Sequence, residues 1–187
     1  MTDPRYAKLT RLLVEYSTAL KKGDHVLVDA IEVPDDFTVE LVRAIRRAGA
    51  VPIVEVRHTR FTRELLRETD TTHAELTRAL ELFRMKKMQA YIAIRGSANA
   101  NENADVDSQR MALYSKILRP VLNYRVNKTK WVVLRWPSPS MAQNAGMSTE
   151  AFENLYFDVC TMDYPKMAKA MVPLEQRMKK AGDVRLA

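Results

Sequence analysis

The sequence has very few of the residues on which common active sites depend. Its single cysteine, Cys160, excludes an internal disulfide framework and a cysteine-based zinc site. Its five glycines match neither a G-x-G-x-x-G dinucleotide fingerprint nor a phosphate-binding loop. The three histidines, His25, His58 and His73, have no second histidine or cysteine at metal-ligand spacing. No serine lies in a G-x-S-x-G nucleophile elbow. Spacing alone therefore predicts no catalytic constellation.

Long apolar runs are also missing. No run approaches the roughly 18 residues that a membrane-spanning helix needs, and the N-terminal stretch MTDPRYAKL lacks the apolar segment of a signal peptide. With 187 residues, of which 47% are apolar, the chain is long enough for one domain with a real core. We therefore expect a cytoplasmic protein with a single domain over residues 1–187. In it, Cys160 is better explained as a buried thiol than as a nucleophile.

Acidic residues are absent from the stretch Ser108–Thr149, although the whole chain has a net charge of +7. Seven basic residues lie in this segment, which we call the basic stretch: Arg110, Lys116, Arg119, Arg125, Lys128, Lys130 and Arg135. Both a solvated face and a surface for an acidic partner or domain fit this pattern.

Short apolar segments alternate with helical patterns along the chain. The expected strands are Val26–Asp29, Ile53–Val56, Tyr91–Ile94 and Val132–Arg135. Asp3 before Pro4, and Ser148, indicate helix starts. Pro173 is expected to kink or split a last helix that begins near Asp163. The alternation predicts an α/β fold, three-layer, with a mostly parallel sheet and helices on both faces.

In such folds, ligands collect at the carboxyl ends of the strands. The segments expected there are Asp29–Glu32, Arg57–His58, Gly96–Asn99 and Pro137–Met147. Glu32, His58 and Asn99 are the candidate polar residues of these strand ends. Among the histidines, His58 has the position most suited to a ligand-binding residue.

The most unusual of these segments is residues 136–148, WPSPSMAQNAGMS. Its prolines and its glycine indicate a compact turn. Met141 and Met147 have adaptable apolar side chains that suit a cover over the sheet end, whereas Gln143 and Asn144 could hydrogen-bond backbone across a gap. These four residues are candidates for three roles that stay open here: a structural plug, substrate contact, or contact with another domain or subunit.

Several short motifs follow one another after the last predicted strand. They are Trp136-Pro137, Ala142-Gln143, Ala145-Gly146-Met147-Ser148, Phe152-Glu153, Phe157, Asp163-Tyr164 and Pro173. At the start of the chain, DPRYAKLTRLLVEYSTALKKGDHVLVDA combines a helix, a K-x-G-D turn and a strand, and LVRAIRRAGAVPIVEV adds the next helix and strand. Together these features resemble the metalloaminopeptidase family of aminopeptidases T, S and II, also called the thermophilic metalloprotease family. The resemblance covers essentially the whole chain, although residues 59–127 match only in layout.

The resemblance implies a two-domain enzyme about twice this length, whose second half binds two divalent metal ions (zinc, cobalt or manganese) through glutamates, histidines, an aspartate and a tyrosine. It identifies this chain with the noncatalytic N-terminal domain of a leucyl-type aminopeptidase, which shapes the substrate chamber and the subunit interface. It transfers no catalytic residue, no metal ligand and no cofactor to this chain. The implied partners are the catalytic domain, a second copy in a homodimer and peptide substrates, without membrane or nucleic acid. The basic stretch suggests an alternative, a stand-alone α/β binding module that holds nucleic acid or another polyanion.

The same resemblance predicts apolar surface where a catalytic half would pack. Met141 and Met147 in the loop, and Val184 and Leu186 near the chain end, are the candidate contacts. We expect the isolated chain to self-associate through the carboxyl ends of its strands and its C-terminal segment, with the basic stretch towards the rim of the contact.

Overall fold

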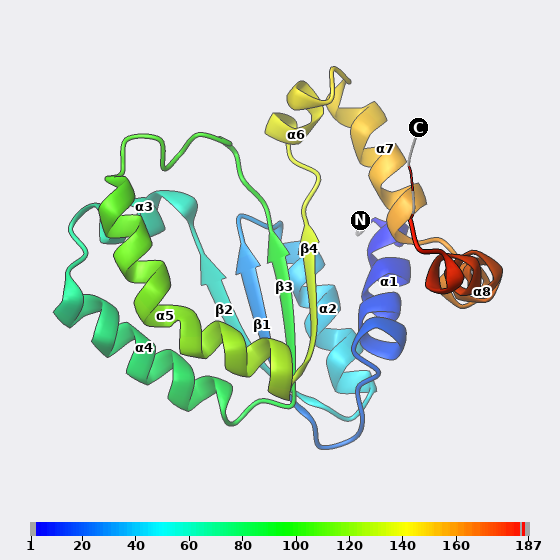
Figure 1. Cartoon of the computed structure of the whole chain (residues 1–187), viewed down its shortest axis with the longest axis horizontal. Helices are drawn as coiled ribbons and strands as arrows, with labels where there is room; N and C mark the ends of the chain where they lie inside the picture. Colours follow the sequence, from blue (N-terminus) through cyan, green and yellow to red (C-terminus); the bar gives the residue numbers. More distant parts are fainter. Residues whose placement is uncertain (1–2, 184, 186–187) are drawn as a thin grey trace.

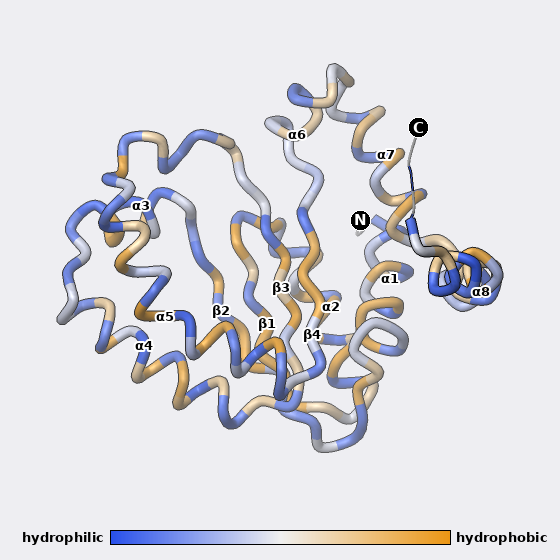
Figure 2. The backbone as a smooth tube through the Cα atoms, in the orientation of Figure 1, coloured by the Kyte–Doolittle hydropathy of each residue, from blue (hydrophilic) through white to orange (hydrophobic). Residues whose placement is uncertain are grey.

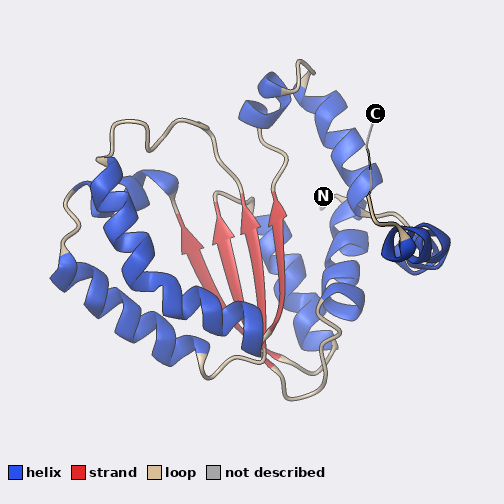
Figure 3. Cartoon of the chain, in the orientation of Figure 1, coloured by secondary structure: helices blue, strands red, loops and turns tan. Residues whose placement is uncertain are grey.

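The computed structural model describes residues 3–183 and 185, so that Val184 and Leu186 lie outside the described residues. One sheet contains the strands β1 (His25–Ile31), β2 (Val51–Arg57), β3 (Ala90–Arg95) and β4 (Lys130–Arg135). The strand order is β2-β1-β3-β4, and every neighbouring pair is parallel (Figure 1 and Figure 3). The predicted α/β fold with a mostly parallel sheet is confirmed, and each expected strand lies inside an observed one.

Helices from both ends of the chain pack on one side of the sheet. They are α1 (Pro4–Arg11), its π-helical continuation η1 (Leu12–Ser17), α2 (Asp35–Arg47) and α7 (Thr149–Cys160). Side chains alternate along a strand, so Val26 and Val28 of β1 share a face. On that face they form one apolar cluster with Leu9, Phe37 and Phe157 of the helices.

A second apolar cluster lies on the other side of the sheet. The helices there are α3 (Thr59–Arg67), α4 (Thr71–Met85) and α5 (Ser108–Lys128). Leu27 of β1 and Tyr91 of β3 pack with Met85 of α4 and Val121 of α5. Figure 2 shows the strands mostly in orange, as expected for a sheet that contributes apolar side chains to both clusters.

The helix-start signals are confirmed at both places. The Asp3 carboxylate accepts a hydrogen bond from the backbone N–H of Arg5 at 2.8 Å, and the Ser148 hydroxyl accepts one from Ala151 at 3.2 Å. The expected split at Pro173 is wrong, because α8 (Tyr164–Lys180) continues through it. A proline removes one N–H donor and crowds the preceding turn, and this exposed helix accommodates that change without ending.

The C-terminal helix α8 lies apart from the sheet (Figure 1), and its first residue, Tyr164, packs against Tyr16 of η1 with ring centroids 5.9 Å apart. None of its residues, 164–180, is buried. Within the part of the chain that the structure describes, no helix is both long and apolar enough to cross a membrane.

Candidate functional site

The topology places a switch point between β1 and β3, because the chain moves from β1 to β2 on one side and later to β3 on the other. Ligands of open α/β sheets bind in the crevice at such a point. Here the backbones after the two strands are in close contact. The N–H of Gly96 donates to the carbonyl of Ile31 at 2.7 Å, and a Cβ on Gly96 would lie 2.3 Å from the carbonyl oxygen of Glu32. The crevice is therefore closed by backbone at its base.

The carboxylate of Glu32 occupies the space above this contact. It accepts hydrogen bonds from the backbone N–H groups of Thr59 at 3.1 Å and Ala98 at 2.9 Å, and from the Thr59 hydroxyl. Burial alone would raise the pKa of Glu32, but these hydrogen bonds outweigh it and hold the pKa below its usual range. Glu32 thus joins the loops after β2 and β3, and it has a left-handed φ of 48° that a non-glycine residue rarely adopts.

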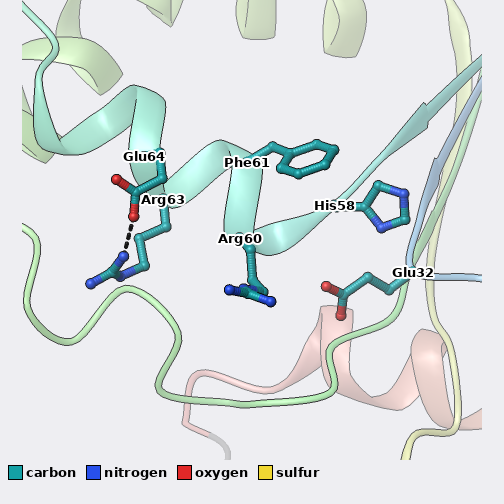
Figure 4. A pocket seen from close by; sticks show the side chains of 6 residues that line it. All are labelled: Glu32, His58, Arg60, Phe61, Arg63 and Glu64. Carbon is teal, nitrogen blue, oxygen red and sulfur yellow. Dashed lines mark hydrogen bonds and ion pairs between the residues drawn. The ribbon is translucent and has the colours of Figure 1, made fainter.

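A cavity of about 460 Å3 opens beside Glu32, between the end of β2 and the helix α3. Figure 4 shows the six residues that line it, Glu32, His58, Arg60, Phe61, Arg63 and Glu64. The rings of His58 and Phe61 meet edge to face, with centroids 5.2 Å apart. Arg63 pairs with Glu64 and donates to Asp105 at 2.9 Å. The predicted residues Glu32 and His58 therefore lie together, in a cavity where Glu32 and Arg63 already have partners.

Asn99 does not line this cavity. Its side-chain oxygen accepts a hydrogen bond from the N–H of Asn101 at 3.0 Å, and its Nδ2 donates to Glu102 at 3.1 Å. Its carbonyl accepts one from the Ser97 hydroxyl at 2.7 Å. These contacts shape the loop after β3.

A second cavity, of about 480 Å3, lies at the carboxyl ends of β3 and β4. Its lining residues are Arg95, Ser97, Ala100, Arg135, Ser138, Ser140, Met141, Asn144, Ala145 and Phe152. The Ser140 hydroxyl donates to the carbonyl of Ser97 at 2.7 Å, and the Ser138 and Ser140 hydroxyls are 2.9 Å apart. The hydroxyl groups join the loop after β3 to the segment after β4.

The segment after β4 contains a short helix, α6 (Pro139–Asn144), where a compact turn was expected. Met141 and Asn144 line the second cavity, whereas Gln143 and Met147 line neither cavity. The side chain that α6 buries is Ala142, which is 1% exposed. Within residues 3–183, no hydrogen bond of the Gln143 or Asn144 side chain is found, so the helix is held by Ala142, by the Ser140 hydroxyl and by its backbone.

Trp136 connects this segment to the core. Its ring packs against Phe37 of α2 and Phe157 of α7, with centroids 4.7 and 6.0 Å away. The Trp136 N–H donates to the carbonyl of Arg95 at 3.0 Å, which extends the β3–β4 pairing by one residue. The side chain is therefore an anchor for the segment that forms the wall of the second cavity.

Residues 2–184 match the family described as Thermophilic metalloprotease (M29). The chain belongs to this family. The resemblance expected from the terminal motifs is confirmed over nearly the whole length. A comparison of this sequence with curated proteins found no match.

The solved structure of AmpT from Thermus thermophilus shares the fold, with a TM-score of 0.65 and 17% sequence identity. The alignment covers 84% of this chain and 42% of AmpT, so the chain spans less than half of that protein. VinN (11% identity, 63% of this chain and 28% of VinN, TM-score 0.30) aligns too weakly to support an argument. The same holds for a LacI-family transcription regulation repressor from Corynebacterium glutamicum (11% identity, 70% of this chain and 60% of that protein, TM-score 0.31).

The family name implies metal ions, and the described residues do not fit a metal centre. Residues 3–183 and 185 contain no group of three or more histidine, cysteine, aspartate or glutamate side chains close enough to hold a metal ion. The acid and imidazole that lie together, Glu32 and His58, do not make such a group, and the Glu32 carboxylate already accepts hydrogen bonds from Thr59 and Ala98. No metal-dependent step can be derived from this part of the thermophilic metalloprotease fold.

A buried polar network between the sheet and α5 was not predicted from the sequence. Asp29 is 2% exposed and accepts hydrogen bonds from Arg57 at 2.9 Å and from the Tyr91 hydroxyl at 2.6 Å. Burial and the Asp29 charge raise the pKa of Tyr91 to about 12. Asp29 was expected at a strand end, but β1 continues to Ile31 and places it inside the strand. An acidic residue within the apolar run HVLVDAI was the available signal.

The basic stretch does not form a single face. Arg110 pairs with Glu68 at 3.5 Å, and Lys130 pairs with Asp24 at 2.9 Å near the opposite end of the sheet. Cys160, expected to be buried, is only partly buried, and that burial raises the pKa of its thiol. A raised thiol pKa disfavours the thiolate, which is the nucleophilic form.

Proposed function

We propose that this chain acts as the noncatalytic N-terminal domain of a metal-dependent, leucyl-type aminopeptidase. The main support for this proposal is the family match over residues 2–184, in a chain whose alignment covers 42% of AmpT. The described residues add no metal-binding group. Removal of N-terminal residues would therefore use metal ligands outside this chain, in a second domain. The chain itself would form one unit over residues 1–187.

In this role the domain shapes the substrate chamber and a subunit interface. Both cavities lie at the carboxyl ends of the strands, the edge where α/β folds bind their ligands. A peptide that enters a chamber there would meet Glu32 and His58 at one end, and α6 with Met141 and Asn144 at the other. Homodimerisation, the cytoplasmic location and the choice of zinc, cobalt or manganese belong to the same proposal.

The experiment compares the chain alone with the protein as cells make it. The recombinant 187-residue chain is assayed on leucyl-p-nitroanilide with and without added zinc, cobalt or manganese, and we expect no turnover. An antibody against the chain is then used to isolate the protein from its native cells. We expect the isolate to contain aminopeptidase activity that a chelator removes.

Two results would overturn the proposal. One is metal-dependent turnover by the recombinant chain, which would place the active site within these residues. The other is a native isolate with no aminopeptidase activity and no metal-binding polypeptide joined or bound to the chain. The second result would leave a stand-alone binding module as the function.

A further inference from the structure

Two arginines lie side by side at the carboxyl ends of β3 and β4. Arg95 and Arg135 are partners in the parallel register, so their Cα atoms are about 4.8 Å apart, the usual spacing of neighbouring strands. Tyr91 and Ala93 face α4 and α5, and Arg95 continues this alternation. Arg135, as the register partner of Arg95, faces the same side. The two guanidinium groups therefore share one face of the sheet.

Neither arginine has an acidic partner within the part of the chain that the structure describes. Arg95 and Arg135 take part in none of its ion pairs. The Nε of Arg95 is buried and has no hydrogen-bond partner among the described residues. Like charges held side by side repel each other, and buried guanidinium donors ordinarily have acceptors. An anion placed between the two arginines would remove both costs.

Basic residues continue from the second cavity into a neighbouring cavity along α5. Arg95 lines the second cavity and also a cavity of about 760 Å3 that runs along α5. The α5 cavity adds Lys116, Arg119 and Arg125, and no aspartate or glutamate is among the described residues that line either cavity. These cations have no ion pair in the described residues either. The groove that the two cavities form thus presents positive charge to a ligand along its length.

The second cavity also has an apolar wall. Met141, Ala145 and Phe152 face the same space as the arginines, and the hydroxyls of Ser138 and Ser140 lie beside them. An inorganic anion has no apolar group that could pack against these side chains. A planar carboxylate next to an apolar side chain fits both parts, because guanidinium groups bind carboxylates through two parallel hydrogen bonds.

Nucleic acid fits these residues less well. A phosphate backbone needs a continuous track of free cations. Beyond the two cavities, Arg110 and Lys130 of the basic stretch pair with Glu68 and Asp24, so the cations without an ion pair do not continue along the whole stretch. Two of the cations without an ion pair, Arg95 and Arg135, instead line the cavity that has an apolar wall.

We propose that the cavity between α6 and the ends of β3 and β4 binds a carboxylate of a polypeptide, held by Arg95 and Arg135, with the neighbouring apolar side chain against Met141 and Phe152. The carboxylate is that of a chain terminus or of an acidic side chain. The inference does not rest on the proposed function, because binding here needs neither a metal ion nor a second domain.

The test is an NMR titration of the 187-residue chain with three short peptides. They are N-acetyl-Leu-Phe with a free carboxylate, the same peptide as its C-terminal amide, and N-acetyl-Glu-Phe-amide, which has a side-chain carboxylate only. We expect at least one carboxylate peptide to bind about tenfold more tightly than N-acetyl-Leu-Phe-amide. Preference for the first peptide assigns a chain terminus, and preference for the third assigns an acidic side chain.

Variants of equal charge change locate the site. Arg135→Gln should weaken carboxylate binding about tenfold, and the exposed Arg135 side chain makes misfolding no concern. Arg46→Gln, an exposed arginine of α2 on the opposite side of the sheet, should leave binding unchanged. Phe152→Ala should weaken binding of N-acetyl-Leu-Phe more than binding of N-acetyl-Leu-Gly, a fourth peptide that keeps the free carboxylate and lacks the phenylalanine ring.

Three results would overturn the proposal. The first is equal affinity for the amide and both carboxylate peptides, including no binding by any of them. The second is carboxylate binding that Arg135→Gln and Arg46→Gln affect equally. The third is a thymidine oligonucleotide that binds more tightly than every peptide and loses its affinity in Arg135→Gln, because that would assign the groove to a phosphate backbone.

Discussion

The two cavities at the carboxyl ends of the sheet are built from similar parts, but their charged groups differ in what they contact. Around the first, Glu32 accepts hydrogen bonds from Thr59 and Ala98, and Arg63 pairs with acidic neighbours. Around the second, Arg95 and Arg135 have no acidic partner in the described residues. Glu32, Arg63 and Glu64 are thus compensated within the fold and join loops to each other, whereas Arg60 of the same cavity has no ion pair in the described residues. The second set is left for something outside those residues.

This difference separates structural charges from charges available to a ligand. A buried or half-buried charge is costly unless hydrogen bonds or an opposite charge compensate it. Glu32 meets that condition inside the fold, so its removal should weaken folding. Arg135 is exposed and has no acidic partner among the described residues, so water solvates its charge, and its removal should affect binding and leave folding nearly unchanged. The following predictions test that separation, from the largest expected effect to the smallest.

Replacement of Gly96 by alanine should have the largest effect, a loss of about 3 kcal/mol in the free energy of unfolding. The added Cβ would lie 2.3 Å from the Glu32 carbonyl oxygen, which is backbone and cannot rotate away. Urea unfolding measures the loss. Gly182→Ala is the control, because a Cβ there meets nothing within 4 Å. Equal stability of the two variants would show that the switch point is not closed.

Glu32→Gln should cost about 1–2 kcal/mol. The amide loses the charge that strengthens the hydrogen bonds from Thr59 and Ala98, although it keeps one oxygen acceptor. Glu15→Gln, at an exposed site without a side-chain hydrogen bond, is the control. If both variants unfold at the same urea concentration, Glu32 does not join the loops as the structure indicates.

The same carboxylate should make stability depend on acid pH. The pKa of Glu32 is lowered in the folded state, so its contribution is present above the unfolded pKa and is lost as pH falls through the folded one. Wild-type stability should therefore decrease between about pH 5 and pH 3, and the decrease should be smaller in Glu32→Gln. Asp3 and Asp24 also have lowered pKa values, so part of the decrease should remain. Parallel curves for the two proteins would contradict this.

Arg135→Gln should have the smallest effect on folding, within about 0.5 kcal/mol of wild type. The side chain is exposed, has no internal ion pair in the described residues, and lies beside the like charge of Arg95. Thermal unfolding with and without a bound carboxylate peptide separates folding from binding, because a ligand stabilises only the protein that binds it. A loss above about 1 kcal/mol without peptide would make Arg135 a structural residue.

Much of the fold could be predicted from local patterns. The four apolar runs form the four strands, and Asp3 and Ser148 cap helices as expected, because a strand signal and a cap each depend on a few adjacent residues. The terminal motifs were sufficient to identify the family. Trp136, the first residue of one motif, packs against Phe37 of α2 and Phe157 of α7 and so anchors the start of the following segment.

The candidate site was only partly accessible to the same reasoning. Glu32, His58, Met141 and Asn144 do lie at strand ends and line cavities there. Arg95 was missed, because the expected segment began one residue later, at Gly96. The basic stretch was interpreted as one surface because it contains no acidic residue. In the structure its residues lie at different ends of the sheet, and only Arg110 and Lys130 form ion pairs among the described residues.

The sequence by itself determined which segments form strands and helices, where helices begin, and to which family the chain belongs. Those properties follow from side-chain periodicity, capping and short motifs, which neighbouring residues encode. Only the tertiary structure decided which charges are compensated. Parallel register places Arg95 beside Arg135, which is far away along the chain, and the parallel pairing of β1 with β3 brings Glu32 to the N–H of Ala98. Electrostatic interactions depend on distance in space, so separation along the chain could not show which charge has a partner and which is free to bind one.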